Sequence, residues 1–347
     1  MKLCVDTKKY NANISKIKSN LKKGTKLCAV VKANAYGLGA EKISKATENN
    51  VDCFAVAFSR EGLKLRELGI KKPILQLSPF ENEFLQESIK EDIMLTVFAE
   101  SQLKDIAYHA KKAGKKACVQ IKINSGMNRY GVNEKSVFHS MLNEVESNKN
   151  LAIAGVFSHL SGRDKEFATF QKDKFLDMTK NVNTTKHIAA SYGTSLGHDF
   201  HLDMVRVGID LIGTGGDNVF QQSVAFKSEI VAFQNVNADE YVGYGDYFMA
   251  KDKIKVAIIR GGYADGVNRL IRNGGCVIIN GLMCKIVGSV CMDCFFADVS
   301  DVKCEAGDSV EIFSENLSLM QYADKIKTIP YEALTQISER VVREYQD

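Results

Sequence analysis

One lysine of this sequence directly follows an apolar run. Residues 27–31, Leu-Cys-Ala-Val-Val, are apolar on both faces, which is typical of a parallel strand covered on both sides, and Lys32 comes next. An amine removed from water has a lowered pKa and becomes a nucleophile toward aldehydes. The pattern suits an enzyme that uses an aldehyde cofactor such as pyridoxal phosphate. A lysine that only extends to solvent from a strand end fits the pattern equally well.

Other groups with chemical potential lie within or just after further apolar segments. They are Lys122, Arg129, His159, Ser191 and Arg206. Each alone is more often structural, but together they would meet at one end of a parallel barrel, where barrel enzymes carry their active sites. Ser191 and the glycine-rich turn 213–216 fall where such barrels commonly bind phosphate.

The elements that must position these residues alternate between strand and helix. Apolar segments predict eight strands, at 26–32, 51–57, 73–77, 94–97, 117–123, 153–159, 187–191 and 204–210. Helical spacing recurs between them, as at Leu103, Ile106 and Ala110 before Gly114. We therefore predict an α/β fold, a (β/α)8 TIM barrel over residues 1–222. No Gly-x-Gly-x-x-Gly follows the first strand, which argues against a dinucleotide-binding fold.

After residue 222 the rhythm changes to short strands separated by turns. Strands are predicted at 225–236, 253–260, 274–281, 283–291, 294–300 and 308–313. Leu334, Ile337 and Val341 have the spacing of a terminal helix. We predict a mostly β second domain over residues 223–347.

Composition excludes several classes of protein. The formal charge of +4 is too small to indicate nucleic-acid binding, and no apolar run is long enough to span a membrane or serve as a signal peptide. The nine cysteines lie mostly in apolar strands, which predicts free thiols and a cytoplasmic location. Cys291 and Cys294 have no second pair or histidine at zinc-site spacing, so no metal is expected.

Short motifs spread over nearly the whole chain resemble those of the alanine racemases. They are 31–37 (Val-Lys-Ala-Asn-Ala-Tyr-Gly), 122–131, 157–159 (Phe-Ser-His), 187–191 (His-Ile-Ala-Ala-Ser), 206–209 (Arg-Val-Gly-Ile), 243–245 (Gly-Tyr-Gly), 262–266 (Gly-Tyr-Ala-Asp-Gly) and 291–293 (Cys-Met-Asp). The resemblance implies pyridoxal 5'-phosphate as cofactor, interconversion of L- and D-alanine for peptidoglycan, and a head-to-tail homodimer.

The resemblance also assigns roles to residues. Lys32 and Tyr244 would be the two catalytic bases. The cofactor would be bound by Lys32, Tyr36, Arg129, His159, Ser191, Arg206, Gly208 and Ile209, and the substrate by Arg129, Tyr263, Met292 and Asp293. Two bases suit a racemase because a proton leaves one face of the α-carbon and another arrives on the opposite face. Tyr244 is expected to be assisted by His159, which lies near Arg206. Whether Lys122 is carbamylated, as in some members, stays open.

The sequence departs from the family pattern at several positions. Ala190 replaces a common Asn, Ser289 replaces an Arg, Glu339 replaces a Tyr, and Asn124-Ser125 replaces Asp-Thr. These changes leave open a racemase of broader amino-acid range. An amino-acid decarboxylase of the same fold type and a non-catalytic cofactor-binding barrel are further alternatives. The Gly-Tyr-Gly motif and the second domain argue against both.

Overall fold

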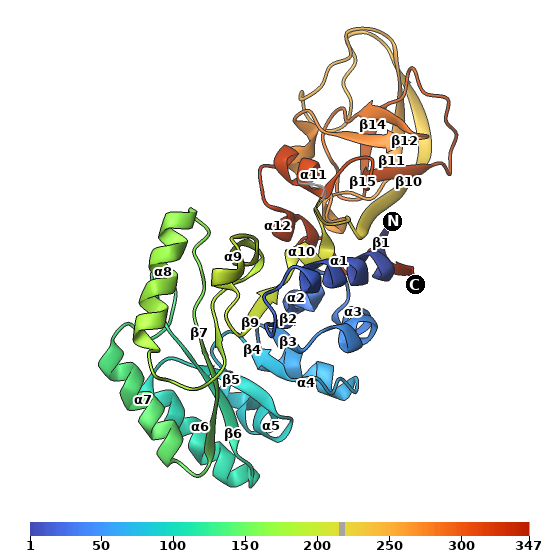
Figure 1. Cartoon of the computed structure of the whole chain (residues 1–347). Helices are drawn as coiled ribbons and strands as arrows, with labels where there is room; N and C mark the ends of the chain where they lie inside the picture. The colour runs from blue at the N-terminus through green and yellow to red at the C-terminus, as the bar shows by residue number, and fades with distance from the viewer. Residues whose placement is uncertain (215–218, 347) are drawn as a thin grey trace. The chain divides into compact units, whose positions relative to one another are not determined.

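The computed structural model describes residues 1–214 and 219–346, which divide into two compact units (Figure 1). The barrel unit contains Ile14–Ala35 and Ala40–Gly208. The C-terminal unit contains Met1–Asn13, Tyr36–Gly39 and Ile209–Asp347. The units thus interleave along the chain, while the domain division predicted at residue 222 stays a prediction.

Eight parallel strands form the sheet of the barrel unit. They are β2 (Lys26–Val30), β3 (Cys53–Val56), β4 (Ile74–Gln76), β5 (Ile93–Val97), β6 (Ala117–Lys122), β7 (Leu151–Phe157), β8 (Lys186–His187) and β9 (Met204–Val207). Their order is β8-β7-β6-β5-β4-β3-β2-β9. The backbone N–H of Arg206 donates to the carbonyl of Ala189 at 3.0 Å, so β9 also approaches the β8 end. The sheet is a nearly closed barrel, and the predicted fold class is confirmed.

Helices accompany these strands on the outside of the barrel (Figure 1). They are α3 (Ala40–Thr47), α4 (Ser59–Glu67), α5 (Leu85–Lys90), α6 (Glu100–Ala113), α7 (Lys135–Ser147), α8 (Lys165–Met178) and the short α9 (Ser191–Ser195). The predicted apolar face of α6 is buried, and Gly114 ends that helix in a left-handed conformation, φ 65°. The seventh predicted strand, 187–191, is mostly wrong: β8 ends at His187, because the chain then turns into α9.

The C-terminal unit is built on eight strands. They are β1 (Lys2–Asp6), β10 (Val224–Val236), β11 (Ile254–Arg260), β12 (Cys276–Ile279), β13 (Leu282–Lys285), β14 (Cys294–Asp298), β15 (Ser309–Phe313) and β16 (Val342–Gln346). Six were predicted, and β1 and β16 were not. β1 pairs antiparallel with β10 and parallel with β16. Four α-helices accompany these strands: α1 (Thr7–Ser19), whose first half belongs to this unit, α10 (Ile209–Ile212), α11 (Leu319–Lys325) and α12 (Pro330–Thr335).

The predicted terminal helix is wrong in its extent. Leu334 lies in α12, but Ile337 and Val341 follow that helix, and the chain ends on β16. All three side chains are buried, as the spacing suggested. Their apolar pattern reports burial correctly, since a helix followed by an irregular segment can bury the same residues as a longer helix.

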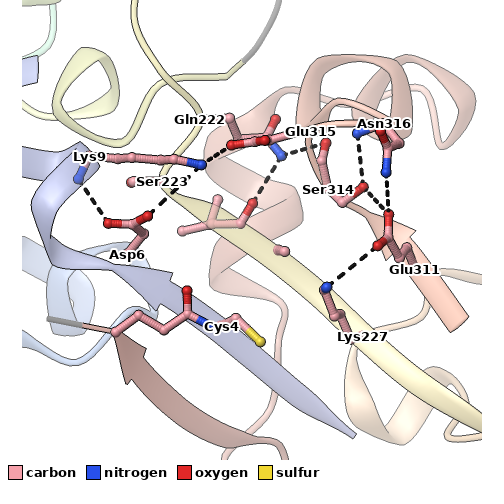
Figure 2. A pocket seen from close by; sticks show the side chains of 13 residues that line it. Cys4, Asp6, Lys9, Gln222, Ser223, Lys227, Glu311, Ser314, Glu315 and Asn316 are labelled. Atoms are coloured by element: carbon pink, nitrogen blue, oxygen red, sulfur yellow. Dashed lines mark hydrogen bonds and ion pairs between the residues drawn. The ribbon is translucent and has the colours of Figure 1, made fainter. Parts of the chain in front are cut away.

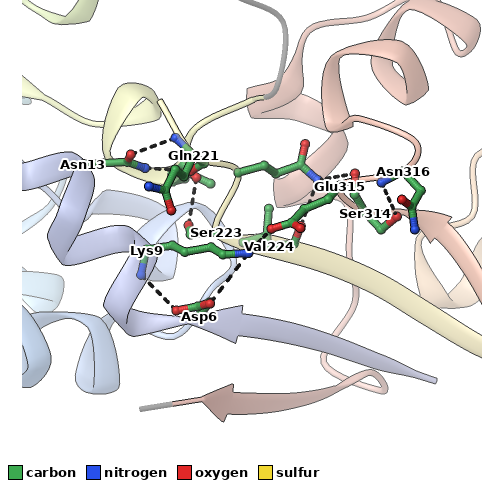
Figure 3. A network of polar contacts seen from close by, with 11 residues as sticks. Asp6, Lys9, Asn13, Gln221, Ser223, Val224, Ser314, Glu315 and Asn316 are labelled. Carbon is green, nitrogen blue, oxygen red and sulfur yellow. Dashed lines mark hydrogen bonds and ion pairs between the residues drawn. The ribbon is translucent and has the colours of Figure 1, made fainter. Parts of the chain in front are cut away.

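Polar contacts fasten the N-terminal segment to this unit. Lys9 forms ion pairs with Asp6 and Glu315, and it lines a pocket with Lys227, which pairs with Glu311 at 3.4 Å (Figure 2). One turn further on, the side chain of Asn13 both donates to and accepts from the backbone of Gln221, at 2.8 and 2.9 Å (Figure 3). The N-terminal strand is therefore an integral part of the C-terminal sheet.

Residues 1–214 and 219–346 contain neither a helix that could span a membrane nor a cluster of metal ligands. None of the helices combines the length and hydropathy needed to cross a membrane. Within the same residues, no group of three or more His, Cys, Asp or Glu side chains could hold a metal ion.

Candidate active site

Lys32 begins a turn of unusual handedness. β2 ends at Val30, and the segment α2 (Lys32–Tyr36) has positive φ angles at Ala33, Asn34, Ala35 and Tyr36, of 52°, 55°, 53° and 57°. Left-handed backbone costs non-glycine residues about 1–2 kcal/mol each. The predicted strand thus stops two residues early, because the chain reverses into this left-handed turn.

Hydrogen bonds hold the turn in place. The N–H of Ala35 donates to the carbonyl of Val31 at 2.9 Å, and the N–H of Ala33 donates to a carboxylate oxygen of Glu61 at 2.6 Å. The side chain of Asn34 accepts from the N–H of Ala40 at 2.8 Å. Strain at four consecutive residues persists only where surrounding contacts impose it, which is common at functional sites.

Basic side chains gather around Lys32 at the carboxyl ends of the barrel strands. Lys122 ends β6, and Arg129 lies in the loop after it. His159 comes two residues after the end of β7, and Arg206 lies on β9. Burial lowers the pKa of Lys32, and Arg129 and Arg206 lower it further, whereas Glu61 acts in the opposite direction. Lys32 therefore holds a larger neutral fraction near pH 7 than an exposed lysine does.

Lys122 and His159 share this cationic environment. Burial, followed by Arg129, Arg206 and Lys32, lowers the pKa of Lys122 to about 7. Its ammonium lies 3.9 Å from the ring centroid of Tyr130, which gives a cation–π contact. Burial and Arg206 lower the pKa of His159 to about 2, so its imidazole is neutral.

Arg206 is fixed by acceptors that carry no charge. The side chain is 2% exposed, and its guanidinium donates to the carbonyls of Ser158 at 2.8 Å and Ile188 at 3.2 Å. It also contacts Nδ1 of His159 at 3.3 Å and Nδ1 of His187. Burial lowers the pKa of Arg206 to about 10, which still leaves it charged at neutral pH.

The site therefore has an excess of positive charge. No salt bridge between described residues involves Lys32, Lys122, Arg129 or Arg206. Lys122 and Arg206 are buried, Lys32 is half-buried and Arg129 is exposed. Because buried charges are normally paired, this donor set suits a ligand with several negative oxygens.

The remaining predicted cofactor residues divide between the two units. Ser191 is buried at the start of α9 and Gly208 follows β9, both in the barrel unit. Tyr36 and Ile209 belong to the C-terminal unit. Burial raises the pKa of Tyr36, and its ring contacts that of Tyr331 at a centroid distance of 5.8 Å. Two residues of the predicted 213–216 turn, Gly215 and Gly216, lie outside the described residues.

The second predicted base, Tyr244, lies on a loop of the C-terminal unit. Its side chain is 74% exposed, but its backbone is anchored: the hydroxyl of Ser289 donates to the Tyr244 carbonyl at 2.9 Å. Gly243, at φ 75°, allows a close approach, since a Cβ there would lie 3.0 Å from the ring of Phe296. The guanidinium of Arg272 lies 3.6 Å from the ring centroid of Tyr247 in the same loop.

The predicted substrate residues of the C-terminal unit form a second exposed group. The N–H groups of Tyr263 and Ala264 donate to the carbonyls of Cys291 and Met292, at 3.0 and 3.2 Å. Asp293 accepts from Arg340 at 2.7 Å, a contact that no sequence signal indicated. Tyr263 and Met292 are 45% and 51% exposed. The predicted hydrogen bond between His159 and Tyr244 joins residues of different units and stays a prediction.

Comparisons with known proteins agree over the whole chain. Residues 5–215 match the model for the alanine racemase N-terminal domain, and residues 223–345 match that for the alanine racemase C-terminal domain. Alanine racemase 2 of Caldanaerobacter subterraneus subsp. tengcongensis is 36% identical, over 96% of this chain and 91% of the relative. The alanine racemase of Methanococcus maripaludis is 32% identical, over 98% and 97%.

A solved structure is similarly close. The alanine racemase of Clostridium difficile 630 matches with a TM-score of 0.93 and 32% identity, covering 99% of this chain and 95% of that one. Both the family models and full-length relatives of this identity point the same way, and the chain belongs to the alanine racemase family.

Proposed function

We propose that this protein interconverts L- and D-alanine with pyridoxal 5'-phosphate as cofactor and so supplies D-alanine for peptidoglycan. The observation that carries the proposal is Lys32, an amine of lowered pKa at the end of β2. The cations around it form no salt bridge with any carboxylate of residues 1–214 and 219–346. An amine in that state suits covalent attachment to an aldehyde. The chemistry is that of a cytoplasmic enzyme that acts on a free amino acid.

The donor set fits this cofactor. Arg129 would supply positive charge for a phenolic oxygen, while Tyr36, Ser191 and the amides of Gly208 and Ile209 would supply donors for a phosphate. His159 and Arg206 would lie against the ring. When bound, the cofactor withdraws electrons from the substrate's α-carbon, so that the proton there becomes removable.

Two side chains would move protons. Lys32 would serve one face of the α-carbon and Tyr244 the other, since a single base cannot readily reach both faces. The partner subunit's Tyr244 would complete each site in a head-to-tail homodimer. The high exposure of Tyr244 within its own chain supports this arrangement. Arg129, Tyr263, Met292 and Asp293 would contact the substrate.

Arg206 would control the side reactions. A guanidinium does not readily give up its proton, so a ring nitrogen facing Arg206 would stay unprotonated. The electron-withdrawing power of the cofactor would then be moderate, which favours proton exchange over transamination. The four uncharged acceptors around Arg206 keep it a donor and support this role.

A wider substrate range is the second candidate, and one contact favours it. The hydroxyl of Ser289 is turned to the backbone of Tyr244, and the residue is 1% exposed. Where relatives carry an extended arginine, this chain therefore has a small inward-facing side chain. A screen of single L-amino acids, with products resolved by chiral chromatography, would separate strict alanine specificity from a broader range.

The assignment of Lys32 is tested by trapping. Borohydride treatment of the enzyme with its cofactor should fix the cofactor to one lysine, and peptide mapping should place it on Lys32. Lys32→Ala should abolish both trapping and racemisation, whereas Lys116→Ala, an exposed control before β6, should change neither. An adduct on any other lysine would refute the assignment.

A further inference from the structure

A buried glutamine of the barrel contacts one of the histidines that hold Arg206. Gln120 lies on β6, two residues before Lys122, and is 2% exposed. Its Oε1 lies 2.6 Å from Nε2 of His187, a fully buried residue of β8. The other ring nitrogen of His187, Nδ1, contacts the guanidinium of Arg206. The three side chains thus form one buried chain of contacts.

The donors and acceptors of this chain fix where the proton lies. A guanidinium only donates, so Nδ1 of His187 must accept and carry no proton. A neutral imidazole then has its proton on Nε2, where the amide oxygen of Gln120 accepts it. The amide nitrogen faces the sulfur of Met94 at 3.5 Å, a weak acceptor that has no proton to give. If the amide of Gln120 were flipped, its NH2 group would face the Nε2–H of His187, and two donors would oppose each other.

The surrounding backbone makes room for this arrangement. Gly155 of β7 pairs with Gln120, and a Cβ at position 155 would lie 3.2 Å from both Cδ and Oε1 of the glutamine. The ring of His187 stacks on Phe157 with a centroid distance of 4.9 Å and an interplanar angle of 5°. The amide and the ring are therefore held in one orientation.

We propose that Gln120 is a positioning residue of this racemase, whose amide oxygen keeps the proton of His187 on Nε2 so that Nδ1 remains an acceptor for Arg206. The proposal rests on the proposed function, which gives Arg206 its task at the cofactor ring. Without the amide oxygen, His187 could carry its proton on Nδ1. That proton would face the donors of Arg206 and displace the guanidinium.

The first measurement determines which ring nitrogen of His187 carries the proton. In the full chain with cofactor bound and 15N-labelled histidine, two-bond proton–nitrogen spectra distinguish the two imidazole tautomers. Comparison with His187→Gln assigns the signal among the six histidines. We expect the Nε2–H form in the native protein and in Gln120→Glu, which keeps an acceptor oxygen, and a mixture in Gln120→Met. Native protein in the Nδ1–H form would overturn the proposal. This result needs folded His187→Gln for the assignment of the signal, but it does not depend on the folding of any Gln120 variant.

The second readout is the course of the reaction. Gln120→Met should lower kcat roughly tenfold with KM little changed and raise the ratio of transamination to racemisation, and Gln120→Glu should restore both values. Gln76→Met is the matched control: Gln76 is also buried, on β4, but its amide contacts Ser59, Ser78 and Pro79. It should leave the tautomer and the ratio unchanged.

The outcomes separate the two proposals. A changed tautomer in Gln120→Met with an unaltered reaction ratio would overturn the positioning role while racemisation stands. A native protein that shows the Nε2–H form but does not racemise alanine would overturn the proposed function and still support the role of Gln120 in fixing His187.

Discussion

The surroundings of Lys32 and Tyr244 are built in opposite ways. Lys32 is half-buried, and its pKa is lowered by burial and by the exposed Arg129 and the buried Arg206. Hydrogen bonds fix the turn that it begins. Tyr244 has a fixed backbone and a side chain that is 74% exposed. The barrel unit thus surrounds Lys32 with charges that change its pKa, while the C-terminal unit fixes only the backbone of Tyr244. A base presented in this way needs a second surface to become buried, and we propose that this surface is the partner's barrel.

The largest effect should come from breaking this complementarity. Tyr244→Phe should lower racemisation by about 10²–10⁴-fold, because one general base is lost. The rate of α-proton removal should fall more for L-alanine than for D-alanine. Both rates are measured by exchange with deuterated solvent. Tyr241→Phe, which alters another exposed tyrosine nearby, is the control and should keep nearly full activity.

Mixing two inactive variants sharpens the same comparison. In a head-to-tail dimer, Lys32→Ala with Tyr244→Phe gives one site with both native bases and one with neither. Random exchange makes about half the dimers mixed, so activity should recover to roughly a quarter of the native value. Demonstrated subunit exchange without recovery would mean that Tyr244 acts within its own chain.

A smaller loss is expected from Arg206, because it does not itself move the α-proton. Arg206→Glu should lower racemisation by about 10²-fold and make transamination to the keto acid detectable, since the ring nitrogen could then hold a proton. Arg206→Lys keeps the charge and should show less transamination. The keto acid is measured with a coupled dehydrogenase. If folded Arg206→Glu racemised alanine at the native rate, Arg206 would not face the cofactor ring.

A still smaller loss of activity is expected from the loop that carries Tyr244. Arg272→Ala removes the cation that stacks on Tyr247, and a contact of this kind is worth about 1 kcal/mol, or about fivefold in rate. The loss should be greater for L-alanine exchange than for D-alanine exchange. Lys255→Ala is the control, because Lys255 stacks on Phe233 away from this loop, at 4.0 Å. Equal losses in both directions would mean that Arg272 does not position the base.

The last effect concerns the stability of the barrel unit and not the rate of the reaction. The pKa of Lys122 falls to about 7 on folding, so the unfolded chain binds more protons between pH 7 and the ordinary value of 10.5. The cost of burying Lys122 is therefore complete below pH 7 and fades toward pH 10.5. Lys122→Met should stabilise the cofactor-free protein most below pH 7, measured by urea unfolding. An advantage that grows with pH would contradict this.

The barrel could be predicted from the sequence, whereas several local features could not. Most residues of the barrel strands are buried, and such apolar runs are readable from sequence. The two-residue strand β8 is the exception, because its apolar run continues into an irregular segment. The residues that follow the barrel strands share one end of the barrel by topology alone. The left-handed turn after Lys32 was not predicted, because Ala33 and Ala35 carry no local signal for positive φ. Likewise β1 and β16 are short and have mixed burial, so only their pairing defines them.

Contacts between distant side chains were equally out of reach. Nothing in the residue types links Gln120 to His187, or Arg340 to Asp293, because 67 and 47 positions separate them. The resemblance shows that Ser289 departs from the family pattern, but it gives no sign of the hydrogen bond from Ser289 to the backbone of Tyr244.

The pairing of β1 with β16 has a consequence for how the protein is made. Lys2–Asp6 leaves the ribosome well before its parallel neighbour Val342–Gln346, which emerges only after more than 300 further residues. At about 5–20 residues per second, β1 waits tens of seconds for that partner. The barrel can form during this wait, whereas the C-terminal sheet can be completed only after Val342–Gln346 has emerged. Its first strand is until then an open edge, which gives chaperones a defined period of action during translation.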